Sequence, residues 1–295
     1  MHTILAQMLE IIEELNPLHA KKIRKNSRLF NDEYDAIFAP MLEKFMRVLN
    51  DRSYDLRNAV ECYLRMIVEI TLEQINFIRN ESYSNASYSE VEKRVFTDKD
   101  KFNSFTLALF ISELLWPQHF LVYFRFIHLF ELYGGKTERF VDIGGSHGQY
   151  INYVFNRSLI EKPFLLFSNP LSLAMVNWFV SPSDYEMMDE KSIYENMKEY
   201  DWVTMGETLE HTENPSKYIE IALRLLKKEG YLFVTAPINA PAIDHVFCFR
   251  SKGEVLSMFR DKGLTLVDEI QVFAEESQKI KYGTASVCSV LFKKV

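Results

Sequence analysis

A cluster of glycines limits the fold of this chain more than any other feature of its sequence. Three of the ten glycines stand at positions 144, 145 and 148, in the segment FVDIGGSHGQY, directly after an apolar run. Glycine permits backbone angles that a Cβ would forbid, so we predict a strand that turns sharply into a helix. The free N–H groups of such a turn point towards a ligand above the sheet edge. The alternative is a tight turn without a ligand.

The spacing of these glycines bears on which ligand the turn would bind. The order G-G-S-H-G does not match the G-x-G-x-x-G fingerprint, in which the backbone approaches the pyrophosphate of a dinucleotide. The sequence therefore disfavours NAD and FAD as ligands of this turn.

Strand-like and helix-like segments alternate after residue 135. The β-rich runs lie at 139–143, 163–167, 201–205, 231–236, 264–273 and 286–293, with a weak run near 176–180. Asn214 as N-cap, Pro215 as first residue and Gly230 beyond the end mark one of the intervening helices, and Ser251 begins another. This alternation predicts an α/β fold with a Rossmann-like, doubly wound, mostly parallel sheet. Such a sheet binds ligands outside the carboxyl ends of its strands.

The first 135 residues follow a helical period instead. Apolar residues repeat at three- and four-residue steps over 34–49 and again over 56–78. Gly134 and Gly135 indicate a helix end and a hinge. We therefore predict an all-α N-terminal cap or substrate domain at 1–135 and a catalytic domain at 136–295. We expect the aromatic residues before the hinge mainly to pack in the core and one or two to line a pocket: Trp116, Phe120, Tyr123, Phe124 and Phe126.

Composition excludes several classes of function. The formal net charge of −7 argues against a general nucleic-acid binder. The most apolar stretch, 105–130, is interrupted by charged residues and by Pro117, which favours buried helices over a membrane span. The three cysteines lack metal-ligand spacing, and the first residues lack the basic segment of a signal peptide. We therefore expect a cytoplasmic protein with reduced thiols.

Two segments resemble a known family. Residues 141–148, VDIGGSHG, are similar to the first motif of class I S-adenosylmethionine-dependent methyltransferases, usually written (V/L)DxGxGxG. The later segment YDWVTMGETLEHTENP resembles the fourth-strand region of the same family, in which E-x-L-E-H follows a strand. The resemblance spans about residues 138–270 and implies S-adenosylmethionine as the cofactor.

The resemblance also assigns cofactor-binding residues. It implies that Asp142 holds the methionine amino group, directly or through water, and that the turn brings its backbone against the cofactor. The remaining positions assigned to the cofactor site are Gly144, Gly145, Ser146, His147, Gly148, Gly206 and Glu207. The family usually has an acid for the ribose hydroxyls after its second strand, where this chain has Ser168 and Asn169. For the adenine segment the match is Asp184, with Asp189 as the alternative.

Methyl transfer needs a nucleophile aligned with the methyl group and, for many acceptors, a base that reaches it. His211 is the strongest candidate because the motif places it beyond a strand end, and Glu207, His245 and His119 are the others. Each histidine could equally be a packed side chain. The carboxylates of Glu207 and Glu210 could instead be solvated groups at a helix start.

Two rival functions remain open. The chain could be a metal-assisted methyltransferase in which His211, Asp244 and His245 bind the ion, because imidazole and carboxylate suit several divalent metals. It could also bind the cofactor without transferring methyl groups. The acceptor, with an O, N or C nucleophile, is expected to be a small molecule, free or tethered to a carrier protein. We expect neither nucleic acid nor membrane as a partner, and a homodimer is an open alternative.

Overall fold

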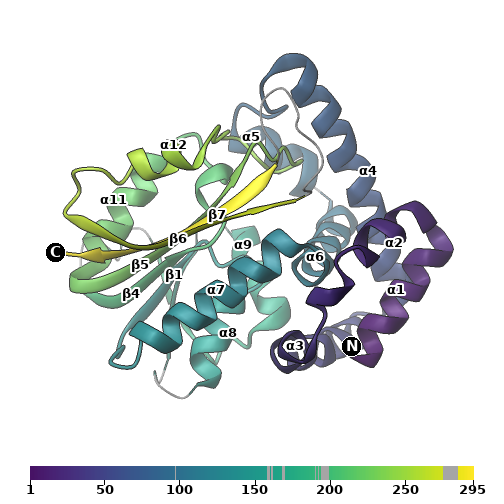
Figure 1. Cartoon of the computed structure of the whole chain (residues 1–295), viewed down its shortest axis with the longest axis horizontal. Helices are drawn as coiled ribbons and strands as arrows, with labels where there is room; N and C mark the ends of the chain where they lie inside the picture. The colour runs from purple at the N-terminus through teal and green to yellow at the C-terminus, as the bar shows by residue number, and fades with distance from the viewer. Residues whose placement is uncertain are drawn as a thin grey trace.

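The protein combines a helical part with a sheet that carries helices on both faces. The computed structural model describes residues 1–96, 98–157, 160, 162–167, 170–189, 191, 193, 199–274 and 285–295. The helical part lies beside the sheet, and helix α7 (Pro117–Tyr133) runs across one sheet face (Figure 1).

Every described element before residue 134 is a helix. The others are α1 (Thr3–Leu15), α2 (Pro17–Arg24), η1 (Ser27–Leu29), α3 (Asp32–Asp51), α4 (Leu56–Asn80), α5 (Tyr88–Val91), η2 (Glu92–Phe96) and α6 (Lys99–Leu115). A reciprocal cap begins α4: Oδ1 of Asp55 accepts from N–H of Asn58 at 2.7 Å, and Oδ1 of Asn58 accepts from N–H of Asp55 at 3.1 Å.

Helices α6 and α7 form a bent pair. Pro117 begins α7, where its missing N–H would have had no helical partner. Among the described residues no single helix is both long and apolar enough to cross a membrane. The α6–α7 pair meets that test only when its two helices are taken together, and these are bent by 71°.

The sheet has seven strands in the order β3-β2-β1-β4-β5-β7-β6. The strands are β1 (Phe140–Ile143), β2 (Phe164–Leu166), β3 (Glu186–Met188), β4 (Tyr200–Met205), β5 (Leu226–Ile238), β6 (Leu264–Phe273) and β7 (Ser286–Lys294). The described helices and 3₁₀ turn between them are α8 (Gln149–Asn156), α9 (Pro170–Phe179), η3 (Leu209–His211), α11 (Pro215–Leu225) and α12 (Lys252–Ser257). Strands β3, β2, β1, β4 and β5 pair in parallel, and β7 runs antiparallel to both of its neighbours. The predicted doubly wound, mostly parallel fold is confirmed.

Alternate residues of the central strands pack on opposite faces of the sheet. Phe140, Trp202 and Phe233 belong to the buried cluster that extends into the N-terminal helices. Val141 and Val203 face the other cluster, which contains α11 and α12. Because one buried cluster runs from the first helices to the sheet, the division at residue 135 into two domains stays a prediction.

The weak strand predicted near 176–180 is wrong. Residues 170–179 form helix α9, and the N–H of Val180 continues its turn by donating to the carbonyl of Val176 at 2.8 Å. Val176 and Val180 therefore lie on one helix face, where they contact the glycine turn at 145 and 148. Packing against that turn overrides the β-rich composition of the segment. The third strand is instead the short β3.

The packing of α7 on the sheet gives a stability prediction. Phe126 is 0% exposed and its ring contacts those of Phe140, Trp202 and Phe233. Truncating such a ring leaves a cavity, so we expect Phe126→Ala to lower the free energy of unfolding by about 3–5 kcal/mol. Leu132→Ala, on the same helix but at a side chain that is 60% exposed, should change it by less than about 0.5 kcal/mol. Urea unfolding measures both, and equal effects would contradict this packing.

Candidate active site

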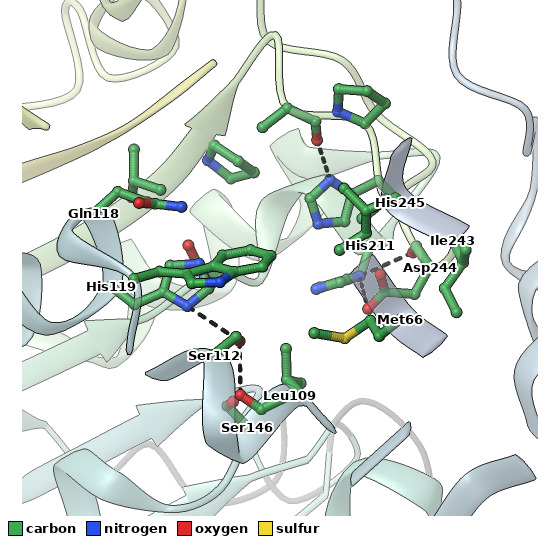
Figure 2. A pocket seen from close by; sticks show the side chains of 18 of the residues that line it. Met66, Leu109, Ser112, Gln118, His119, Ser146, His211, Ile243, Asp244 and His245 are labelled. Atoms are coloured by element: carbon green, nitrogen blue, oxygen red, sulfur yellow. Dashed lines mark hydrogen bonds and ion pairs between the residues drawn. The ribbon is translucent and has the colours of Figure 1, made fainter. Parts of the chain in front are cut away.

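A cavity of about 820 Å³ lies at the carboxyl edge of the sheet. Gly144 and Ser146 line it beyond β1, and Glu207 lines it beyond β4. The helical part contributes residues from α4, α6, α7 and the junction of α6 and α7: Met66, Ile70, Leu109, Ser112, Glu113, Trp116 and His119. Figure 2 shows His119 on one side of the cavity and His211, Asp244 and His245 on the other. The volume lies in the usual range for small-molecule sites, about 300–1,000 Å³.

The glycine turn, residues 144–148, forms the floor of the cavity at the carboxyl end of β1. Gly144 has φ +104°, and a Cβ there would lie 2.5 Å from Oγ1 of Thr208. The same hydroxyl donates to the carbonyl of Ile143 at 2.8 Å and so joins the β1 turn to the segment beyond β4. A Cβ on Gly148 would lie 2.5 Å from Val180. These glycines therefore allow neighbouring elements to approach, and of the five residues at 144–148 only Gly144 and Ser146 line the cavity.

His147 faces away from the cavity. Its side chain is buried, its Nε2 lies 3.1 Å from the carbonyl of Thr106 on α6, and its ring packs against Phe110 and Phe179. Burial lowers the pKa of His147 to about 4, so the imidazole is neutral near pH 7. The contacts of His147 join the turn to α6.

Asp142 has one oxygen without a partner. The hydroxyl of Thr204 donates to Oδ1 at 2.7 Å, whereas Oδ2 is buried and has no hydrogen-bond partner. The side chain does not line the cavity and is 1% exposed. Burial raises the pKa of this carboxyl to about 7, although the Thr204 bond opposes the shift. A buried oxygen of this kind fits a cationic group of a ligand, or a water that leads to one.

The raised pKa of Asp142 predicts a specific pH dependence of stability. Because the folded-state pKa of about 7 exceeds the ordinary aspartate pKa of 3.8, this group lowers the free energy of unfolding as pH rises from about 4 to 7. Asp142→Asn removes the ionisation, so the variant should lose less stability than the wild type over this range. Urea unfolding without ligand at pH 5 and pH 8 measures the difference. Equal pH dependence in the two proteins would contradict the assignment.

The segment beyond β4 carries most of the predicted catalytic residues. Gly206 does not line the cavity. A Cβ there would lie 2.3 Å from the ring of Tyr150, so the glycine allows this ring to approach. Glu207 has φ +46°, and its N–H donates to Oγ1 of Thr235 at 2.8 Å. Burial raises the pKa of Glu207, which His211 opposes. Both Glu207 and His211 line the cavity, as the sequence motif predicts for residues beyond a strand end.

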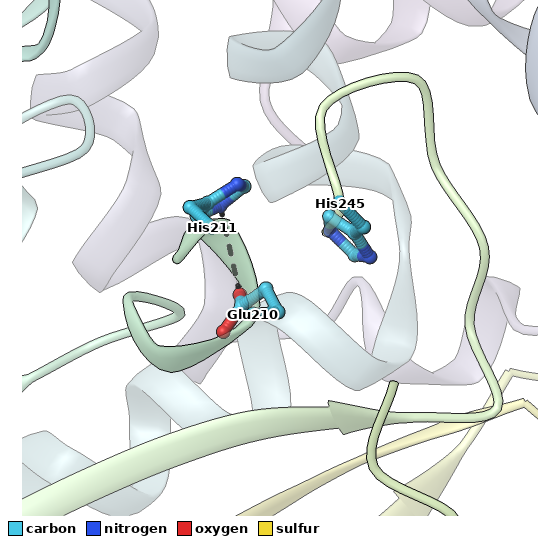
Figure 3. Close-up of side chains that lie close together, drawn as sticks. All are labelled: Glu210, His211 and His245. Atoms are coloured by element: carbon cyan, nitrogen blue, oxygen red, sulfur yellow. Dashed lines mark ion pairs between the residues drawn. The ribbon is translucent and has the colours of Figure 1, made fainter. Parts of the chain in front are cut away.

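Glu210, His211 and His245 lie together at one side of the cavity (Figure 3). Nε2 of His211 is 3.7 Å from Oε1 of Glu210, and the two imidazole rings are 5.2 Å apart between centroids. Burial lowers the pKa of His211, but Asp244 and Glu210 outweigh it and raise that pKa. Burial lowers the pKa of His245 to about 4.

The reading of Glu210 as a solvated group at a helix start is wrong. Its side chain is 0% exposed, and neither carboxylate oxygen has a hydrogen-bond partner. Its backbone carbonyl accepts from N–H of Val246 at 2.8 Å and of Phe247 at 2.9 Å. The loop after β5 therefore covers Glu210, a long-range contact that local sequence does not reveal.

The helical part contributes Glu113 and His119 to a second acidic cluster, which Glu207 completes. Glu113 on α6 and His119 on α7 lie 3.7 Å apart, between Oε1 and Nδ1, and both line the cavity with Glu207. Burial raises the pKa of Glu113 and lowers that of His119. From the sequence, His119 is only one of several candidate bases, and Glu113 is one of the charged residues that interrupt the apolar stretch 105–130. That interruption was the available signal, because a charged residue in a buried helix usually has a function or a partner.

The predicted contacts to ribose and adenine are only partly described. Ser168 and Asn169 lie outside the described residues. Asp184 precedes β3, so it lies at the amino edge of the sheet, opposite the cavity, and the match to an acid after the third strand is wrong. The alternative, Asp189, directly follows β3 and lies at the carboxyl edge.

Solved structures with the same fold include two methyltransferases. An O-methyltransferase family protein from Burkholderia thailandensis is 13% identical, with a TM-score of 0.52, over 81% of this chain and 71% of that one. Coclaurine N-methyltransferase, solved with N-methylheliamine and S-adenosylhomocysteine, is 13% identical, with a TM-score of 0.50, over 88% of this chain and 95% of that one. Since residues 136–295 are little more than half of the chain, this second match includes most of the helical part.

The sequence itself matches one family profile. No curated protein sequence matches the chain significantly. The profile described as "methyltransferase domain" matches residues 115–286, which include α7, the glycine turn and the segment beyond β4. Because this match covers more than half of the chain, the protein belongs to the methyltransferase domain family.

Proposed function

We propose that the protein transfers a methyl group from S-adenosylmethionine to a small molecule, free or tethered to a carrier protein, in the cavity between sheet and helices. One observation carries the proposal. The same cavity is lined by the Gly144 turn, by the Glu207–His211 segment and by helices α4, α6 and α7. A cofactor at the turn and an acceptor under the helices would therefore share one cavity, as alignment of the reacting groups requires.

The residues near the turn fit the proposed cofactor. The unpartnered oxygen of Asp142 suits the cationic amino group of the methionine moiety, and Gly144 leaves the floor of the cavity free of a side chain. Ser146 and Glu207 offer further polar groups along the same wall. When bound, the cofactor supplies a methyl group already activated by its positive sulfur, so the protein's task is positioning and exclusion of water.

The acceptor would lie between His211 and the helices. His211 is held by its Nδ1, 3.0 Å from the carbonyl of Asp244, and we assign it to act on the acceptor, as a base or by orienting it. His245 and Glu207 line the same space and complete the proposed catalytic group. The three cysteines are unpaired, which agrees with a cytoplasmic enzyme.

A labelling experiment tests this function. We would incubate the protein with S-adenosylmethionine carrying a deuterated methyl group and a metabolite extract, and search for the label in small molecules by mass spectrometry. We expect at least one labelled product that is absent with His211→Ala. If the wild-type protein binds S-adenosylhomocysteine but labels neither free nor carrier-bound metabolites, it binds the cofactor without transferring methyl groups.

A further inference from the structure

We propose that Glu210, His211 and His245 bind one divalent first-row metal ion at the wall of the cavity. One ligand atom from each residue lies within 4.8 Å of the other two. Donor atoms bound to one ion at about 2.1 Å lie about 3–4 Å apart, so small side-chain rotations would close the site. Two imidazoles and one carboxylate suit first-row divalent ions better than calcium or magnesium.

The carboxylate of Glu210 is the first observation that points to an ion. It is fully buried, and both of its oxygens lack a hydrogen-bond partner. A buried carboxylate without partners is costly, and native proteins seldom keep one without a bound ion, a water or a functional role. Nε2 of His211 lies 3.7 Å from Oε1. That distance is too long for a hydrogen bond and leaves room for an ion to bring the groups together.

The orientation of the two histidines is the second observation. Nδ1 of His211 lies 3.0 Å from the carbonyl of Asp244, and Nδ1 of His245 lies 2.8 Å from the carbonyl of Ala240. A carbonyl oxygen only accepts, so in each neutral ring Nδ1 carries the proton and Nε2 keeps its lone pair. Histidines that bind metals are commonly held in this way, by a backbone carbonyl on the nitrogen away from the ion. The loop after β5 thus presets two rings for coordination.

The metal-assisted alternative drawn from the sequence has Asp244 as a ligand, and the geometry favours Glu210 in its place. Oδ2 of Asp244 lies 3.6 Å from Nδ1 of His211, on the side of the ring that faces away from Glu210. Asp244 therefore positions the imidazole rather than binding the ion. His211 and His245 line the cavity, so an ion held there would be open to a molecule in the cavity. With Nε2 of His211 on the ion, this residue would orient the acceptor and would not act as a base. That the methyl acceptor fills one of them rests on the proposed function, but metal binding itself does not.

Binding of Mn²⁺ to the full-length protein tests the site. After treatment with a chelator, the protein is titrated with Mn²⁺, and the free ion is followed by electron paramagnetic resonance without S-adenosylmethionine. We expect one ion per chain, and at least tenfold weaker binding in Glu210→Gln and in His245→Gln. The experiment measures the ion itself, so a protein that transfers no methyl group could still bind Mn²⁺. Likewise, a protein that binds no Mn²⁺ could still transfer methyl groups.

A matched variant separates this site from the other acidic cluster. Glu113, His119 and Glu207 also place three ligand atoms within 4.8 Å of one another. Unlike Glu210, Glu113 has a partner, because Nε2 of Gln149 donates to its Oε2 at 3.5 Å. Glu113→Gln, at a buried glutamate of the same cavity, should bind Mn²⁺ as the wild type does. Wild-type affinity in Glu210→Gln, or loss of the ion in Glu113→Gln alone, would overturn the proposal. Circular dichroism confirms that each variant is folded.

Discussion

Replacement of His211 by alanine is expected to lower turnover by about a hundredfold to ten-thousandfold, the usual cost of losing a group that moves or positions a proton. His211 follows β4 within one short turn, lines the cavity and is fixed by the carbonyl of Asp244. It does not belong to the glycine turn. The dissociation constant for S-adenosylmethionine should therefore change by less than about tenfold, or 1.4 kcal/mol.

Two measurements on the same variant decide the role of His211. The methyl-transfer assay gives turnover, and calorimetry gives cofactor affinity. His128→Ala, at an exposed histidine on α7, is the matched control and should behave as the wild type. Wild-type turnover in His211→Ala would remove the residue from catalysis. Lost cofactor binding in a folded variant would place His211 in the cofactor site instead.

Replacement of Gly144 by valine is expected to abolish cofactor binding, with at least a hundredfold loss of affinity. At φ +104° a branched side chain is strained, and its Cβ would lie 2.5 Å from the Thr208 hydroxyl that bonds to Ile143. The variant must therefore move either the turn or the segment beyond β4, and both line the cavity. The valine side chain would also occupy space at the cavity that Gly144 lines.

Calorimetry with S-adenosylhomocysteine measures the effect of Gly144→Val. Gly135→Ala is the control, because no atom lies within 4 Å of its added Cβ and its φ is not positive. If Gly144→Val does not fold, Gly144→Ala places the same Cβ against Thr208 with less bulk. Affinity within tenfold of the wild type in a folded Gly144 variant would contradict the assignment of the turn.

The fold was predictable where local signals act alone. Asn214 caps α11 and Pro215 begins it, as the sequence indicated, because capping depends on residues adjacent in the chain. The helix nevertheless ends at Leu225, well before Gly230, the residue that marks its end in the sequence. Lys227 belongs to β5 and forms an ion pair with Asp201, a contact set by strand pairing. Val176 was predicted to lie in a strand but belongs to helix α9. Here too a contact between distant segments, with the glycine turn, decides the conformation.

The candidate site was predictable on the sheet side and less so on the helix side. The motif located Gly144, Glu207 and His211 at strand ends, and parallel strands bring those ends to one edge. No local pattern reveals that Glu113 from α6 approaches Glu207, or that the loop after β5 buries Glu210. Such contacts depend on how distant segments pack. The error at Asp184 followed directly from the misplaced third strand.

Titration of the wild-type protein with S-adenosylhomocysteine shows whether the cavity binds the cofactor. We expect one binding site per chain in the micromolar range, and no binding heat with folded Gly144→Val or Gly144→Ala. A crystal of that complex should place the ligand against residues 144–146, with its methionine amino group near Asp142. If the folded wild-type protein binds neither S-adenosylhomocysteine nor S-adenosylmethionine, the assignment of the cavity as a cofactor site is wrong.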